Sequence, residues 1–473
     1  MFTTINYADI TVTFHFSNGA TLNLYVNDSD SDDDEQVIES IDINPSLAAT
    51  TSNPLGSVAA SSLELTLSDE SSDLFPNNVN SPYYGYMDKT CYITVACTKL
   101  YIESEDEPTD NVPQEQTLQT PAPLGTFYVS SWESVDSSDD VSGVRISALD
   151  LISTIGNMEV PIVALDVTQS AIAYFRNVVT ALNARLPQYK QIVLENNDTF
   201  GTFDNNIRYR NLKSDGKVID LLNQFSHCLL CNIYMDTSNV LKIDSILDDP
   251  QEQPVYTMSD DTNLTSVKVE NGLLVDYSGV NVNYPVDRSA ITETLGQMRD
   301  VSFSDLTFNN YHFDDSVYKL AYIVISSSTD ICPVPTSMLH DNTEMNLVLS
   351  AESGTTADDS YNVEMYGSKQ AAGFVSTSDV TDDSVCTIEN SLIQKAHVQD
   401  YLDAINEYMQ NKRSGLSCTG AFDPRLKLGD VVTVTSTLLG LSSKYKVTKL
   451  NWHLDDNFGC EAELRAVTEV QGV

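Results

Sequence analysis

The sequence predicts a mainly β protein in which two antiparallel β-barrel segments flank a small α/β segment. Three observations predict this fold class. Residues 1–160 contain short runs that alternate apolar and polar residues between turns rich in Gly, Pro, Asn and Ser, which is the spacing of half-buried strands. Residues 161–255 change to the helical period of apolar residues. Residues 391–473 return to alternation after one more helix.

The first segment, residues 1–160, predicts an all-β barrel or sandwich with long loops. Ile10 to Phe16 alternates, Asn18-Gly19 is a hairpin turn, and Thr21 to Val26 returns along the first strand. Further strands are expected at Val37–Ile43, Ser62–Leu67, Tyr92–Cys97, Leu124–Trp132 and Val144–Leu149. Residues 103–123 are acidic, Pro-rich and nearly devoid of apolar residues, so we expect a mobile excursion there.

Residues 161–255 predict a small α/β domain. Asp166 to Thr168 is a candidate cap for a helix whose apolar positions recur on one side. These positions are Ile172, Phe175, Val179, Leu182 and Leu186. A second helix is expected over residues 216–227, and it leads into a hairpin over residues 228–246 that turns at 236–239.

The remaining residues predict a second barrel that is interrupted. Residues 256–390 open it with two strands between 264 and 284, and the strand candidates 318–326, 345–349 and 361–366 are interpreted as elaborations. A helix follows from a cap at Asn390-Ser391 to about Lys412, with an apolar stripe that we expect to pack on the barrel. The stripe comprises Val398, Leu402, Ile405 and Met409.

The C-terminal strands, with the helix in residues 391–473, are expected to complete the second barrel. Pro424 excludes helix, and Gly429-Asp430 gives a tight turn before the β-branched run 431–435. Two alternating runs, 444–454 and 460–466, then predict an antiparallel meander with one solvated face.

Composition narrows the class of function. The 473 residues hold 25 basic and 68 acidic side chains, a net charge of -43, and such a surface disfavours sequence-specific binding of nucleic acid. The charge indicates either simple solubility or an acidic channel wall past which DNA slides. No apolar run reaches the roughly 18 residues that span a bilayer, and the N-terminus lacks a signal region, so we expect a soluble chain made in the cytoplasm and no membrane insertion.

Two clusters have residue types that occur in metal or redox sites. Cys228 and Cys231 have CxxC spacing with His227 beside them, but a zinc site normally needs four ligands, so two core thiols are the favoured interpretation. The eight cysteines are scattered and are expected to be reduced. The run Asp28 to Glu35 alternates carboxylates as a calcium loop does, yet it lacks the glycine and the distal glutamate of that motif. A solvated loop is favoured there, and weak Ca²⁺ binding is the alternative hypothesis.

No enzymatic motif is present in the sequence. The six histidines, at positions 15, 227, 312, 340, 397 and 453, stand outside any motif, and no nucleophile elbow, zinc-protease signature or phosphate loop occurs. We therefore predict no enzyme, no catalytic, cofactor-binding or metal-ligating residues, and no cofactor.

Several segments, taken in order, resemble the hub proteins of phage tail tips and baseplates. In the first segment these are Asn44 to Leu47, Pro54 to Leu67, Ser81 to Met87 and Pro123 to Val129, followed by Ala148-Leu-Asp150. The hairpin over 232–243 and the order "helix, Asp-Pro-x-Leu-x-Leu-Gly-Asp, Tyr-x-Val-x-x-Leu" at the C-terminus resemble the same family. That family also includes the N-terminal half of tail-associated lysins and type VI spike proteins.

The resemblance implies two related barrels in each chain and a homotrimer. Such a trimer would match the six-fold tail tube above to a three-fold spike or fibre below, and DNA or tape-measure protein would pass through its acidic lumen. Expected neighbours are the tail tube or distal tail protein, the tape-measure protein and the central spike or fibre, in the virion. Tail lysins carry their hydrolase after the hub, and this sequence stops at Val473 directly after the meander.

Two other classes of function are alternatives. A virion receptor-binding or carbohydrate-binding β-protein would use Tyr83, Tyr84 and Tyr86 as sugar platforms. A peptidoglycan hydrolase has no motif in its favour.

Overall fold

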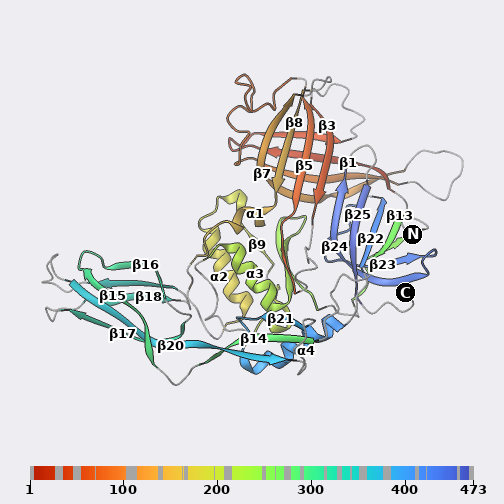
Figure 1. Ribbon diagram of the computed structural model, residues 1–473. Helices are drawn as coiled ribbons and strands as arrows, with labels where there is room; N and C mark the ends of the chain where they lie inside the picture. The colour runs from red at the N-terminus through yellow and green to blue at the C-terminus, as the bar shows by residue number, and fades with distance from the viewer. Residues whose placement is uncertain are drawn as a thin grey trace.

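The computed structural model describes most of the chain in separate stretches. These are residues 5–26, 36–45, 55–69, 71–102, 114–136, 142–161, 163, 169–195, 198–206, 216–247, 252–260, 263–270, 279–287, 292–313, 317–327, 333–340, 344–350, 360–376, 385–410, 415–421, 423–454 and 459–467. Figure 1 shows the first β unit at the top, the second β unit at its lower right, a helical unit below the first and an arm of strands that extends to one side. Among these residues no helix is long and apolar enough to cross a membrane.

The first β unit is an antiparallel sheet in the order β3-β5-β8-β7-β6-β1-β2. Its strands are β1 (Ile5–His15), β2 (Thr21–Val26), β3 (Gln36–Asn44), β5 (Ser62–Asp69), β6 (Tyr92–Ile102), β7 (Gln114–Asp136) and β8 (Ser142–Leu149). The two end strands, β2 and β3, contact each other. The alternation recognised in the sequence places Ile10, Val12 and Phe14 inside, where they are fully buried.

The second β unit has the order β12-β23-β24-β25-β22-β13. Its strands are β12 (Tyr256–Ser259), β13 (Leu264–Glu270), β22 (Gly415–Ala421), β23 (Val431–Ser436), β24 (Leu441–His453) and β25 (Gly459–Ala466). The expected turn at Gly429 is present with a φ of 83°, which favours glycine. All neighbouring strands are antiparallel except β12 and β23, which are parallel.

The two β units share one topology, as the resemblance predicted. The chain order and sheet order of β3, β5, β6, β7 and β8 match those of β13, β22, β23, β24 and β25, whereas the next strand differs, since β1 lies antiparallel to β6 and β12 lies parallel to β23. The bulges match as well. Ser130 is the bulged residue of β7 and Thr448 that of β24. Each donates its hydroxyl to a carbonyl of the facing strand at 2.9 Å, that of Ser147 or that of Glu463.

The small α/β unit follows the first β unit. Its sheet has the order β4-β10-β11-β9, from β4 (Val58–Ala59), β9 (Val193–Leu194), β10 (Cys231–Met235) and β11 (Val240–Ser245). The helices α1 (Leu151–Gly156), α2 (Ala171–Asn183) and α3 (Val218–Leu229) pack on it around one core. Ser170 caps α2 by accepting from the Ala173 amide. The predicted cap at 166–168 was therefore wrong, and those residues lie outside the described part of the chain.

The helix α4 (Val398–Gln410) differs from its prediction in start and packing. Asn390 does not cap it, because the Asn390 Oδ1 accepts from the amides of Leu392 and Ile393 in an earlier turn. The stripe containing Val398, Leu402 and Ile405 is buried in the core of the α/β unit. Packing of this stripe on the second barrel was therefore a wrong expectation, since the helix lies against β14 (Gly279–Asp287).

The residues interpreted as elaborations of the second barrel form sheets of their own. The second of the two strands expected to open that barrel, up to Tyr284, was wrongly placed, because it is β14 and pairs outside the second β unit. One sheet holds β14, β15 (Glu293–Ser302), β17 (Val317–Ser327), β20 (Ser360–Ser376) and β21 (Val385–Glu389), and the other holds β16 (Thr307–His312), β18 (Val334–His340) and β19 (Glu344–Ser350). Their separate core contains Leu295, Leu347 and Met365. The strand candidates 318–326, 345–349 and 361–366 are confirmed as strands in this arm, which Figure 1 shows projecting from the body.

One loop prediction in the first unit also needs correction. The excursion expected over 103–123 ends earlier, because β7 already begins at Gln114 and continues the ladder with β6, where Ile102 faces Gln114. Backbone hydrogen bonds of an antiparallel ladder do not depend on apolar side chains, so the ladder can extend through polar residues. Residues 103–113 lie outside the described part of the chain.

Candidate functional site

The two β units are joined edge to edge into one continuous sheet. The last residues of β24 pair antiparallel with β3, so that Trp452 faces Ile43 and His453 faces Asp42. The Leu454 amide donates to the Ile41 carbonyl at 2.9 Å, and the Leu450 amide donates to the Pro45 carbonyl at 3.0 Å. Backbone pairing fixes both the distance and the twist between the two units.

Side chains on both faces of this joint reinforce the pairing. On the inner face Trp452 and Ile43 are fully buried, and they belong to one apolar core that runs through both units. On the outer face the His453 imidazole lies 2.5 Å from the Asp42 carboxylate, and Asn451 contacts the other ring nitrogen. The two units therefore share backbone pairing, an apolar core and a side-chain contact at this joint.

The C-terminal corner supports the second unit beside this joint. The buried carboxylate of Asp423 receives the Arg425 amide at 2.9 Å and the Arg425 guanidinium at 2.7 and 2.9 Å. Asp430 accepts from the Lys427 amide at 2.8 Å, and the Gly429 amide donates to the Val447 carbonyl. These bonds hold the turn that the Leu-Gly-Asp sequence predicted.

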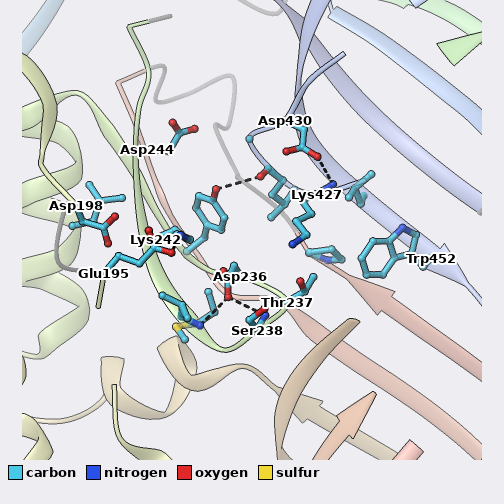
Figure 2. Close-up of a pocket in the computed structure, with 18 residues that line it drawn as sticks. Glu195, Asp198, Asp236, Thr237, Ser238, Lys242, Asp244, Lys427, Asp430 and Trp452 are labelled. Carbon is cyan, nitrogen blue, oxygen red and sulfur yellow. Dashed lines mark hydrogen bonds and ion pairs between the residues drawn. The ribbon is translucent and has the colours of Figure 1, made fainter. Parts of the chain in front are cut away.

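A cavity of about 580 Å³ lies where the second β unit meets the hairpin β10–β11. Figure 2 shows its carboxylates and lysines arranged along both walls. The charged residues of the lining are Glu195, Asp198, Asp236, Lys242, Asp244, Lys427 and Asp430. Tyr234 closes one side by donating its hydroxyl to the Leu428 carbonyl at 3.2 Å.

The charged groups of this cavity mostly make local contacts within their own unit. Lys242 pairs with Glu195, and Asp236 accepts the Ser238 and Val240 amides of its own turn. Burial raises the pKa of Asp430, and burial also raises that of Asp198. Among the described residues no group of three or more His, Cys, Asp or Glu side chains is arranged to hold a metal ion.

The CxxC pair lies inside the α/β core. Cys228 lies in the last turn of α3 and Cys231 begins β10, and both are buried. Burial raises the pKa of the Cys228 thiol to about 11 and that of Cys231 well above its ordinary value. Burial also lowers the pKa of the neighbouring His227 imidazole. Neutral thiols in an apolar site are poor nucleophiles and poor metal ligands.

The other candidate residues are not brought together. Tyr83 stacks on Phe16 with ring centroids 4.6 Å apart, and Tyr86 packs partly against the first core, whereas Tyr84 is 48% exposed. His15 stacks on Tyr92, His312 pairs with Glu344, and His397 pairs with Asp400. The acidic run 28–35 lies outside the described residues.

Sequence reasoning missed the residues that tie the units together. Asp42 and His453 are 411 positions apart, and Asp244 and Lys446 likewise come from separate segments. Their local sequence shows only strand alternation, so no spacing rule could pair them. The shared topology of the two β units was the one feature that could have pointed to these contacts. It can be recognised in the sequence only through resemblance to a known family.

Searches for similar proteins gave matches among solved structures. No family model matches the chain, and no curated protein matches it.

The chain is similar to the tail protein from Neisseria meningitidis MC58, with 12% identity, a TM-score of 0.49 and 96% of each chain covered. It is also similar to the 43 kDa tail protein of prophage MuSo2 from Shewanella oneidensis, with 12% identity, a TM-score of 0.46, and 97% of this chain and 98% of that one covered. A third match is the Francisella PdpA-VgrG complex, with 9% identity, a TM-score of 0.43, and 98% of this chain and 59% of that one covered. The matched structures are described as two tail proteins, one of them from a prophage, and a VgrG complex.

Proposed function

We propose that the protein is a structural hub of a phage tail tip or baseplate. The observation that carries the proposal is the pair of β units with one topology and matching bulges, joined edge to edge within a single chain. Two equivalent units in each chain let three copies present six similar surfaces. The ordered motifs of the sequence, from the Leu-Gly strand at 124–129 to the corner at 421–434, support the same assignment.

In this proposal the protein is a homotrimer in the virion, and it matches the six-fold symmetry of the tail tube to the three-fold symmetry of a spike or fibre. Its six β units face the six-fold tail tube or distal tail protein on one side. Its three-fold side holds a central spike or fibre, and the arm of residues 279–389 projects from the ring. Permanent assemblies of this kind bury large interfaces.

The channel through the trimer would not bind DNA specifically. A net charge of -43 repels phosphates, so DNA and tape-measure protein would pass without specific binding. The chain would be made in the host cytoplasm and would carry no catalytic activity of its own. The ties within the cavity in Figure 2 fit a scaffold, because its charged groups hold neighbouring segments in place.

The experiment that tests the proposal measures copy number and position. Light scattering of the purified chain should give the mass of three copies, and electron microscopy of the assembled particle should place a three-copy density at the tail tip. A protein that stays monomeric at high concentration and is absent from that density would overturn the proposal. Loss of receptor binding with intact tails in a deletion phage would favour the receptor-binding alternative.

A further inference from the structure

The joint inside the chain uses one edge of each β unit. The second unit contributes residues 450–454, at and just beyond the end of β24, and the first unit contributes residues 41–45, at and just beyond the end of β3. Because the two units share one topology, each unit also has a strand edge that is equivalent to the edge contributed to the joint by the other unit. The edge equivalent to β24 is on β7, and the edge equivalent to β3 is on β13.

The bulges set the residue-by-residue equivalence of these edges. Aligning the bulge at Ser130 with that at Thr448 places Ser134 of β7 at the position of Trp452. The ladder between β13 and β22 shifts between Leu264 and Ser266, as that between β3 and β5 shifts between Ile38 and Ser40. In the second unit Val269 therefore occupies the position of Ile43, and Lys268 that of Asp42.

Both equivalent edges lack a second ladder among the described residues. The pairing of β7 with β6 ends at Tyr128, which faces Tyr92, and residues 131–136 of β7 pair with β8 alone. The pairing of β13 is with β22 alone. A strand edge with open backbone groups is a template for pairing with another chain.

We propose that β7 of one copy pairs antiparallel with β13 of a second copy, in the register of the joint between β24 and β3. Ser134 then faces Val269, and Val135 faces Lys268. The contact is heterologous, since each copy offers β7 on one side and β13 on the other, so repetition closes a ring when the rotation completes a circle. This inference rests on the proposed homotrimer and names the strands that build it.

The charges on the two edges are mixed. Glu133 is exposed on β7, and Lys268 is exposed on β13. In the proposed register Glu133 lies directly opposite Glu270 and diagonally across from Lys268. Like charges directly opposite each other destabilise a strand pair, so the equivalence of the backbone edges, and not charge, fixes the register.

A pair of cysteines tests the register in the full-length protein. The variant Val135→Cys/Lys268→Cys places two thiols opposite each other across the proposed contact, at a separation that a disulfide spans. Mild oxidation should convert most of the protein into a covalent trimer that a reducing agent dissolves. Each single variant, and the shifted pair Val135→Cys/Ser266→Cys, should stay uncrosslinked, which also controls for the native half-buried Cys386.

The outcomes separate this inference from the proposed function. A trimer by light scattering without a crosslink in the matched pair would overturn the strand assignment while the hub proposal stands. A monomer in the same measurement would overturn both. Hydrogen exchange on the unaltered protein gives a second readout, since the amides of residues 131–136 and of β13 should be protected more than tenfold better in the trimer than after dilution to monomer. Equal exchange in both states would contradict the pairing.

Discussion

The Lys446 ammonium of β24 lies 2.7 Å from the Asp244 carboxylate of β11, and it thereby ties the second β unit to the α/β unit. The side chain of Lys446 is 7% exposed and that of Asp244 is 28% exposed. The Ser245 carbonyl at 3.4 Å is a second acceptor for the same ammonium. The buried partner of an ion pair suffers more when its counter-charge is removed than the solvated partner does.

We expect the two halves of this pair to respond unequally to mutation. Asp244→Asn leaves a buried ammonium without its counter-charge and should lower the free energy of unfolding by about 2–4 kcal/mol. Lys446→Met leaves a partly solvated carboxylate and should lower it by roughly 1 kcal/mol. Thermal unfolding followed by near-ultraviolet circular dichroism measures both. Equal losses, or a larger loss for Lys446→Met, would contradict the burial argument.

The matched bulges predict equal effects in the two β units. Ser130→Ala and Thr448→Val each remove one hydroxyl-to-carbonyl hydrogen bond of 2.9 Å, so each should cost about 0.5–1.5 kcal/mol. Equilibrium denaturation of the two variants beside the unaltered protein provides the test. A difference between them above about 1.5 kcal/mol would show that the bulges are not equivalent.

Gly56 permits the contact between the first β unit and the α/β unit. Its φ is 105°, and an added Cβ would lie 2.3 Å from the Cys231 carbonyl oxygen. Gly56→Ala should therefore destabilise the protein by about 3 kcal/mol or more, because both the backbone and the neighbouring strand must shift.

Gly19 is the matched control for this substitution. Its φ is 86°, and nothing lies within 4 Å of an added Cβ. Gly19→Ala should cost only about 1 kcal/mol. Thermal unfolding compares the two variants, and a similar loss for both would disprove a steric contribution at Gly56.

Asp150 should make the stability depend on pH. Its carboxylate accepts the Ser61 amide at 2.7 Å at the exit from β8, and burial raises its pKa to about 7. The same carboxyl ionises near pH 4 in the unfolded chain. The folded state therefore binds more protons between these values, and the contribution of Asp150 to stability falls as the pH rises from about 4 to 7.

Asp150→Asn removes this titration. The stability advantage of the unaltered protein over the variant should be greater at pH 5 than at pH 8 by roughly 1–3 kcal/mol, since one pKa unit corresponds to about 1.4 kcal/mol. Urea midpoints at the two pH values provide the measurement. An advantage that is the same at both values would show that Asp150 does not titrate in this range.

The CxxC cysteines should be inert in the folded protein. Burial and the raised pKa of both thiols keep them neutral, and only the thiolate reacts. A thiol reagent followed by peptide mass spectrometry should label Cys386 well before Cys228 or Cys231. Labelling of either core cysteine within minutes at neutral pH would contradict this prediction.

Local patterns predicted the elements, and tertiary contacts decided their partners. The alternation of Ile10 to Phe16 and the turn at Gly429 follow from sequence alone, because strand period and turn geometry are local properties. The packing of α4 does not, since an apolar stripe fits any apolar surface and the α/β core competes with the second β unit. The joint of Trp452 with Ile43 depends on backbone pairing, which does not require particular side chains and so cannot be recognised in the sequence.

The long sequence separation between the paired strands β13 and β22 affects how the chain folds during its synthesis. The first β unit is complete once Leu149 has emerged from the ribosome, whereas β13 waits until residues 415–421 have been made. Loop closure over such a span is slow. Trp452 reaches its place beside Ile43 later still, so a nascent chain can hold a complete first β unit before the edge of β3 has found its partner within the chain.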